Sequence, residues 1–199
     1  MKWRIPVIFL ILGIMLVFTG GKGLVTIFVL PVNYITDQDS DWTKLKNGQS
    51  VAADFYAMYA PCCIYSKDGS DTSAIYVVPD IKPDENGDYV AKHYMGVAVS
   101  RKDFAAYDRL IGIQDYSNFT DSDYVIFDGY LRKLKKDERN YFVQYLKEAG
   151  FSDSEIDDVL IPYVAVKRQT PLSYLGMFGG GILCLAIGAV TGVLFFKKR

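Results

Sequence analysis

Leu172 to Phe196 reads LSYLGMFGGGILCLAIGAVTGVLFF, 25 residues without one charged side chain. As a helix this stretch would be about 37 Å long, which is enough to cross a bilayer with some tilt. Lys197, Lys198 and Arg199 follow it directly. Because cations at the end of a span stay preferentially in the cytoplasm, the stretch predicts a transmembrane helix over residues 172–196 and a cytoplasmic tail at residues 197–199.

The amino-terminal end has the same character. Lys2 and Arg4 precede an apolar run that starts at Ile5. We predict a cytoplasmic tail at residues 1–4 and a first transmembrane helix at residues 5–21, because the next segment, residues 25–29, is rich in β-branched side chains that favour strands. Two alternatives stay open: a helix that continues to Leu30, and a cleaved signal peptide, although no Ala-x-Ala-like site follows the run.

Charge divides the chain in the same way. All 23 acidic residues lie between Asp37 and Asp158. The middle region, residues 32–169, has 16 basic residues, which gives it a net charge of −7. The other six basic residues lie in the two end segments. This asymmetry predicts a cell-membrane protein with both termini in the cytoplasm and an acidic extracytoplasmic domain, with its connectors, over residues 22–171. It gives no basic face for nucleic acid.

The middle region predicts an α+β domain with one core. Strands are expected at residues 51–59, 75–78, 89–99, 124–131 and 161–166, the last at a sheet edge because Pro162 interrupts it. Helices are expected at residues 100–112, 137–149 and 153–159, with capping boxes at Ser100/Asp103 and Ser152/Glu155. These elements could form a small open barrel resembling an OB-fold.

The order of two apolar segments and a helix carries a family resemblance. Ala74–Pro79 reads AIYVVP, Tyr94–Val99 reads YMGVAV, and the expected helix comes next. This order resembles an uncharacterised group of bacterial two-span membrane proteins, and the resemblance covers most of the chain. It implies the two-span architecture and no chemistry, since that group has no established activity.

Known catalytic and metal-binding patterns fail in this sequence, so we expect no catalytic, cofactor-binding or metal site. His93 is the only histidine, which excludes multi-histidine metal sites. Asp37, Asp39 and Asp41 copy the first three ligands of a calcium loop, but Trp42 and Gly48 stand where that loop needs Gly and Glu. We therefore expect a solvated linker there.

Four shorter features have an ordinary structural interpretation. The carboxylate pairs Asp121/Asp123 and Asp157/Asp158 suit a polar turn and a helix start, and Asn118–Thr120 is a glycosylation triplet that matters only in a eukaryotic secretory route. Gly179–Gly181 lies within the second span, away from any phosphate. Cys62 and Cys63 are adjacent, and two interpretations stay open: buried thiols in a strand, or a vicinal disulfide.

The sequence is most typical of a membrane-anchored interaction, scaffold or accessory protein. Fourteen of the 15 tyrosines lie between Tyr34 and Tyr163, and tyrosine is enriched in interfaces. The alternatives are an extracytoplasmic enzyme with a site of Asp, Tyr and Lys, or a ligand or ion sensor. Small residues recur every four positions in the second span, which predicts packing on a protein partner, on the first span through its own glycines, or on a second copy. These are Gly176, Gly180, Cys184, Gly188 and Gly192.

Overall fold

The computed structural model describes residues 4–28, 32–111, 124–168 and 170–197. The chain forms two compact units. The first consists of the two ends of the chain, residues 1–31 and 169–199, and the second of residues 32–168. The middle region therefore has a core of its own.

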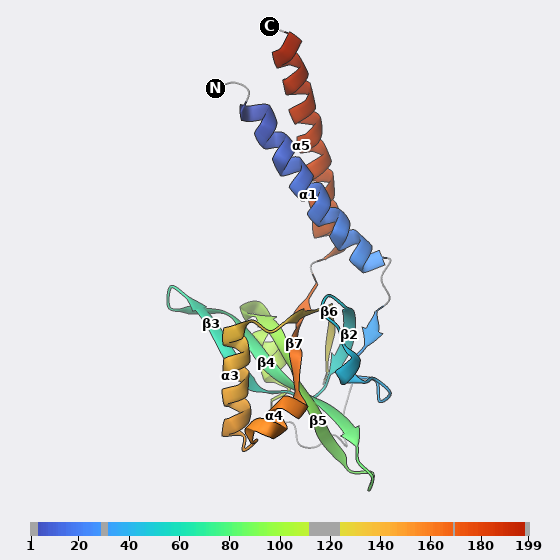
Figure 1. The fold of residues 1–199 in the computed structure, drawn as a ribbon, viewed down its shortest axis with the longest axis vertical. Coiled ribbons are helices and arrows are strands. Elements are labelled where there is room, and N and C mark those ends of the chain that lie inside the picture. Colours follow the sequence, from blue (N-terminus) through green and yellow to red (C-terminus); the bar gives the residue numbers. More distant parts are fainter. Residues whose placement is uncertain (1–3, 29–31, 112–123, 169, 198–199) are drawn as a thin grey trace. The chain divides into compact units, whose positions relative to one another are not determined.

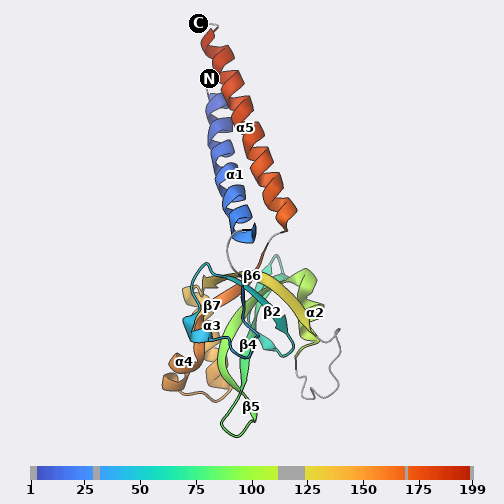
Figure 2. The same cartoon turned by 90° about the vertical axis from the view of Figure 1, so that its right-hand side faces the viewer.

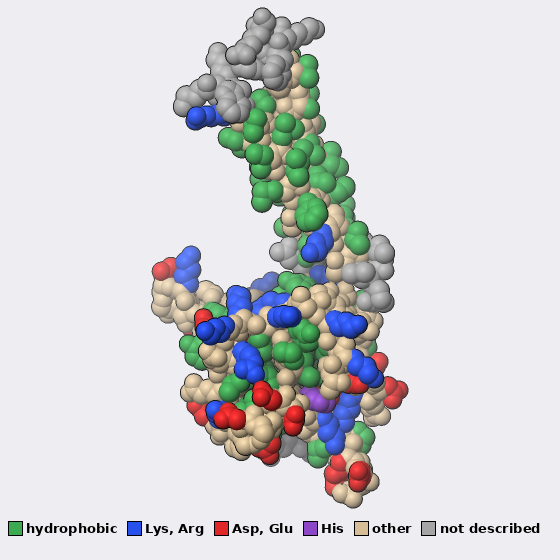
Figure 3. Space-filling model, in the orientation of Figure 1, with side chains coloured by type: hydrophobic (Ala, Val, Ile, Leu, Met, Phe, Trp, Pro, Cys, Tyr) green, Lys and Arg blue, Asp and Glu red, His purple; other side chains and the backbone are tan. Residues whose placement is uncertain are grey.

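The first unit is a pair of long helices, α1 (Arg4–Phe28) and α5 (Pro171–Lys197), that lie side by side (Figures 1 and 2). Each is long and apolar enough to cross a membrane. Apolar side chains cover most of the pair in Figure 3. Helix α1 continues through Phe28 rather than ending at Gly21, so the strand-like interpretation of residues 25–28 is wrong. Here Thr26 Oγ1 donates to the carbonyl of Lys22 at 2.8 Å, a bond within the helix.

Glycines bring the two helices close together. A Cβ atom built on Gly181 would lie 2.7 Å from the amide nitrogen of Val17, and one on Gly20 would lie 2.6 Å from that of Phe178. A Cβ atom on Gly13 would lie 2.8 Å from Leu185 Cγ, and one on Gly188 would lie 3.0 Å from Leu10 Cγ, a looser contact. At Gly181 and Gly20 the two backbones nearly touch, so a larger residue there would force the helices apart, as is usual between apolar helices.

The second unit is built on a mixed, seven-stranded sheet in the order β1-β2-β6-β7-β5-β4-β3, which is not a closed barrel. The β1–β2 and β5–β7 pairs are parallel, and the other neighbours are antiparallel. The strands are β1 (Asn33–Tyr34), β2 (Ser50–Phe55), β3 (Tyr59–Lys67), β4 (Ser70–Pro83), β5 (Tyr89–Ser100), β6 (Val125–Lys133) and β7 (Leu160–Lys167). The helical elements are η1 (Trp42–Lys44), η2 (Arg101–Asp103), α2 (Phe104–Asp108), α3 (Lys136–Glu148) and α4 (Asp153–Val159).

Helices cover the sheet from opposite sides (Figure 2). On one side the largest core cluster packs Phe55, Tyr76 and Phe127 with Tyr107 and Leu110, from α2 and the turn that follows it. On the other side the apolar faces of α3 and α4 pack on β4, β5 and β7, with Phe142, Leu146 and Ile156 at the centre. The sheet is thus buried on both faces in its middle.

Two prolines lie inside the sheet at places where no amide hydrogen is needed. Strand β7 lies between β6 and β5, so the expectation that Pro162 marks an edge is wrong. The register between β5 and β7 shifts from Tyr94↔Leu160 to Gly96↔Val164, and Pro162 lies within that shift. Strand β4 likewise continues through Pro79, which lies beyond the last pair that β4 makes with β3.

Of the two predicted capping boxes, the structure contains one. Ser152 Oγ accepts from the amide of Glu155, whose carboxylate accepts from the amide of Ser152, so this capping box is confirmed. The Ser100 side chain forms no such cap, and a 3₁₀ turn precedes the short α2. The expected end of that helix at Gly112 lies outside the described residues.

The first and last strands of the domain, β1 and β7, are linked by a row of paired residues that runs across the sheet from strand to strand. Asn33 pairs with Val51, Val51 with Gly129, and Gly129 with Lys167. Three strand spacings separate the start of β1 from the end of β7, or about 15 Å. The domain therefore receives and releases the chain at neighbouring points.

Candidate functional site

Asp80 is a buried carboxylate near the end of β4 and is 5% exposed. His93 lies opposite it on β5, with Nδ1 3.1 Å from Asp80 Oδ2. The ammonium of Lys82 is 3.7 Å from Asp80 Oδ1. A two-residue turn at Asn86-Gly87 would pair Asp80 with His93 by counting alone. The pairs nearest the turn, from Pro83↔Tyr89 to Ile81↔Ala91, run one residue out of that register, and a bulge between Ile81 and Asp80 restores it.

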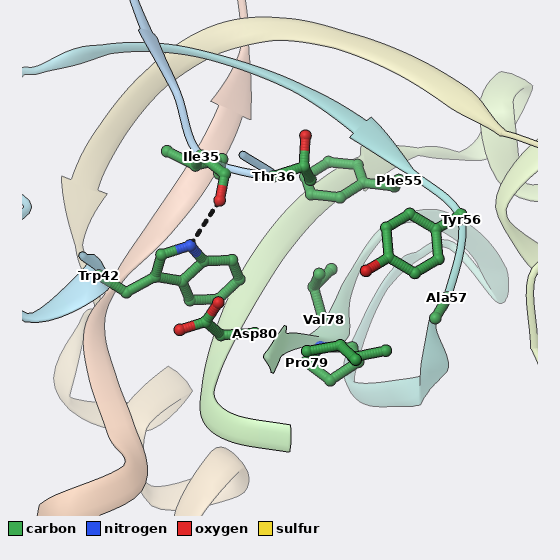
Figure 4. A pocket seen from close by; sticks show the side chains of 10 residues that line it. Ile35, Thr36, Trp42, Phe55, Tyr56, Ala57, Val78, Pro79 and Asp80 are labelled. Atoms are coloured by element: carbon green, nitrogen blue, oxygen red, sulfur yellow. Dashed lines mark hydrogen bonds between the residues drawn. The ribbon is translucent and has the colours of Figure 1, made fainter. Parts of the chain in front are cut away.

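A small hollow adjoins Asp80 (Figure 4). Trp42 and Asp80 line it beside one another, and Phe55, Tyr56 and Pro79 face them. Trp42 is fixed by a 2.7 Å hydrogen bond from its indole nitrogen to the carbonyl of Ile35. The hollow measures about 10 Å³, which is room for one water molecule.

The positions of the carboxylate and the histidine relative to the hollow differ from those in a catalytic site with a nucleophile, a histidine and a carboxylate. In such a site the histidine faces the substrate and the carboxylate orients it from behind. Here Asp80 lines the hollow and His93 is not among its lining residues. The Asp80–His93 contact therefore supports the hairpin of β4 and β5, and at this position the structure offers a water-sized space rather than a substrate pocket.

Lys82 organises the acidic connector that resembles a calcium loop. Its ammonium donates to the backbone carbonyls of Asp37, Gln38 and Ser40 at 2.8, 2.6 and 2.8 Å. Carbonyl oxygens turned toward one point are what a bound cation requires. In this protein a lysine from β4 supplies that cation.

The carboxylates of the connector are occupied elsewhere or exposed. Asp41 accepts from the amide and the hydroxyl of Thr43 and lies 2.9 Å from the ammonium of Lys44. These hydrogen bonds from Thr43 and Lys44 lower the pKa of Asp41 to about 2. Asp37 and Asp39 are exposed. Among the described residues, no group of three His, Cys, Asp or Glu side chains is placed to hold a metal ion.

A second buried carboxylate, Glu138, joins α3 to β6 and β3. It is 2% exposed and forms two hydrogen bonds with the guanidinium of Arg132, at 2.6 and 2.8 Å. Tyr65 OH and the amide of Lys135 also donate to it, at 2.6 and 2.7 Å. Burial raises the pKa of Glu138, but the hydrogen bonds outweigh it and bring the pKa to about 2. The group is fully satisfied within the fold.

The adjacent cysteines are free thiols in β3. Cys63 is buried, and Cys62 donates to the carbonyl of Ile75 at 3.5 Å. Burial raises the pKa of Cys62 to about 12. Since the thiolate is the reactive form, this thiol is unreactive at neutral pH.

The remaining sequence candidates lie apart from these clusters. Asp157 is largely exposed and pairs with Arg139 at 3.1 Å, and Asp158 is exposed. The pair Asp121/Asp123 and the triplet Asn118–Thr120 lie outside the described residues. Gly179–Gly181 is part of α5, and of these three glycines only Gly181 would bring a Cβ atom within 4 Å of other described residues, Val17 and Gly13.

Several large side chains stand exposed on the domain. Ile126 of β6 and Tyr89 of β5 are 70% and 68% exposed, and Tyr141 of α3 and Ile64 of β3 are 53% and 52% exposed. Tyr59 lies against Tyr94 with ring centroids 6.1 Å apart. The abundance of tyrosine thus serves both the core and the surface.

Residues 1–194 match a family model described as a domain of unknown function, DUF8577. The match spans both long helices and the whole domain between them. The chain belongs to this family. A comparison with curated proteins finds no match. The family description states no activity.

Proposed function

We propose that this member of the family is a two-span membrane protein that holds its middle domain outside the cytoplasm as an interaction, scaffold or accessory module. The two apolar helices and the charge pattern support the membrane placement. Six of the 22 basic residues lie in the end segments, and the middle region carries −7. By the positive-inside rule both termini are then cytoplasmic.

One observation favours interaction over chemistry. The two buried carboxylates among the described residues are paired within the fold, since Glu138 binds Arg132 and Asp80 contacts His93 and Lys82. The exposed groups that stand out are instead large apolar and aromatic side chains, such as Ile126 and Tyr89. Exposed apolar groups with tyrosine are typical of surfaces that bind another protein.

Protease accessibility tests the placement. Protease added to intact cells or right-side-out vesicles should digest residues 32–168 and spare tags placed at both termini. Protected middle residues with cleaved tags would reverse the orientation. Crosslinking in cells followed by mass spectrometry tests the interaction, and we expect recurrent crosslinks from the domain lysines to the same partner protein. Crosslinks within the chain alone would contradict an interaction role.

Helix α5 also has a face for a partner helix. A Cβ atom built on Gly176 or Gly180 would meet no neighbouring atom of the described residues within 4 Å, whereas one built on Gly188 would lie 3.0 Å from Leu10 of α1. Of the predicted small-residue stripe, the first part is thus free to meet a partner or a second copy. In a membrane two-hybrid assay Gly180→Ile should weaken association between chains, and Gly188→Ile should act on the α1–α5 contact instead. Unchanged association with Gly180→Ile would exclude this face.

A further inference from the structure

Strand β3 is the last strand of the sheet, and no strand of the described residues covers its outer edge. Proteins commonly protect such an edge with proline or with bulges that interrupt pairing. The first half of β3 has both: it contains Pro61, and two register shifts against β4 leave Ala60 and Cys62 without partners. This half is a poor template for another strand.

The second half of β3, from Cys63 to Lys67, has no such protection. Each of its five residues has a partner on β4, and the extra residue at the last register shift, Thr72, belongs to β4. Among the described residues, no strand pairs with the outer side of this segment. Ile64 is 52% exposed here, and such a side chain on an open edge favours pairing with another chain.

Basic side chains flank this segment. Residues 132–139 contain five cations and two carboxylates within a domain of net charge −7. Tyr65 of β3 bonds to Glu138, which ties the start of α3 to the edge, and Lys135 and Lys136 are exposed there. In Figure 3, blue side chains gather around the start of α3, and red ones around its end and α4. Lys67 adds a further cation at the end of β3 itself.

We propose that residues 63–67 of β3 take up an extended, acidic peptide segment of a partner protein by strand addition. Backbone hydrogen bonds would hold the segment, its apolar side chains would pack on Ile64, and its carboxylates would face Lys67, Lys135 and Lys136. This rests on the proposed function and names the surface and the chemistry of the partner.

Charge disfavours a second copy as the occupant. Two copies paired through β3 by a twofold axis would present the same patch to each other. The lysine-rich starts of both α3 helices would then lie on one face and repel. An acidic strand has the complementary charge.

The test uses the full chain in nanodiscs and a probe peptide of eight residues that alternates glutamate and valine and carries fluorescein. Fluorescence anisotropy should show saturable binding that weakens with salt. The variants Ile64→Asp and Lys135→Glu/Lys136→Glu should each weaken it at least tenfold. The matched controls Ile126→Asp and Lys44→Glu/Lys46→Glu change exposed residues of other elements and should alter it less than twofold. Circular dichroism should show that all four variants keep the fold.

Two further probes separate strand addition from charge alone. The same peptide N-methylated at every backbone amide should bind at least tenfold more weakly, and a lysine–valine peptide should not bind. Equal binding of the methylated peptide, or equal losses in the test and control variants, would overturn the proposal. So would a Lys135→Glu/Lys136→Glu variant that loses binding to anionic vesicles while keeping its affinity for the peptide, because the patch would then be a lipid site.

Failure of this inference and failure of the proposed function are distinguishable. If the domain lies in the cytoplasm but still binds the peptide through β3, the proposed membrane orientation is wrong and the β3 binding site stands. If the domain is extracytoplasmic and crosslinks repeatedly to one partner, but Ile64→Asp does not change peptide binding, the proposed function stands and the β3 site is wrong.

Discussion

At the scale of single residues, buried charged side chains of the domain form hydrogen bonds that connect different secondary-structure elements. Glu138 receives hydrogen bonds from β3, from β6 and from the backbone just before α3, and Lys82 binds three carbonyls of one connector. A buried charge is tolerated when its hydrogen bonds are complete, and removing one partner leaves the other charge uncompensated. These residues are therefore sensitive points of stability.

Glu138→Gln should destabilise the domain by about 3 kcal/mol, because the guanidinium of Arg132 would lose its paired charge. The matched control is Asp157→Asn, which breaks the exposed Arg139–Asp157 pair and should cost less than about 1 kcal/mol. Chemical unfolding of the full chain in detergent, followed by tryptophan fluorescence, measures both. Equal effects would show that the Glu138 pair contributes no more than a surface pair.

The same residue should make stability depend on pH. The folded pKa of Glu138 is lowered from 4.5 to about 2. A lowered folded pKa gives stability that is fully present above pH 4.5 and is lost as the pH falls toward 2. Unfolding free energies measured between pH 6 and pH 2.5 should therefore fall, and Glu138→Gln should reduce this fall. A Glu138→Gln variant with the slope of the unchanged protein would contradict the assignment.

Lys82→Met should loosen the connector at residues 35–45, because three carbonyls lose their donor. We expect a loss of about 3 kcal/mol, since hydrogen bonds to charged groups contribute about 1.5–3 kcal/mol each and methionine keeps most of the side-chain volume. Hydrogen exchange should accelerate at the amides of Lys44 and Leu45. Lys44→Met, which alters a largely exposed lysine, is the control and should leave exchange elsewhere in the connector unchanged.

At the scale of elements, tertiary packing determines which helices and strands can be predicted from sequence patterns. The two long helices could be predicted from composition alone, and α3, α4 and β5 from periodicity and caps. The position of β7 could not be predicted, because a register shift removes the constraint that Pro162 normally imposes. The Tyr65–Glu138 bond joins residues 73 positions apart, and no local pattern encodes it.

The glycines of the helix pair give a matched test at this scale. Gly181→Ala should separate α1 from α5, because its methyl group would lie 2.7 Å from the backbone of Val17, whereas Gly180→Ala adds a methyl group in open space. The readout is disulfide formation between Leu10→Cys and Gly188→Cys in a Cys184→Ser background. Gly181→Ala should lower the yield several-fold at a cost of about 1–3 kcal/mol, and Gly180→Ala should not. Equal yields would mean that the helices do not pack through Gly181.

At the scale of the whole molecule, the two units differ in what stabilises them. The helix pair exposes most of its apolar side chains and relies on close backbone contact. The domain has large core clusters on both sides of its sheet and buried charges that are paired inside it. Because its two ends lie in one row of the sheet, the chain can be cut at both connectors without opening a strand in the middle.

A protein of residues 31–169 should therefore be soluble without detergent and should unfold in one cooperative step. Its core involves only residues of the second unit, and a domain of this size is large enough to be stable alone. Urea unfolding followed by tryptophan fluorescence and by far-ultraviolet circular dichroism should give coincident transitions, with Trp42 reporting directly on the core. Glu138→Gln in this shortened protein is the control and should shift the midpoint to lower urea. Aggregation, or two separate transitions, would show that the domain needs its helices to fold, and its core would then have to be assigned to the whole chain.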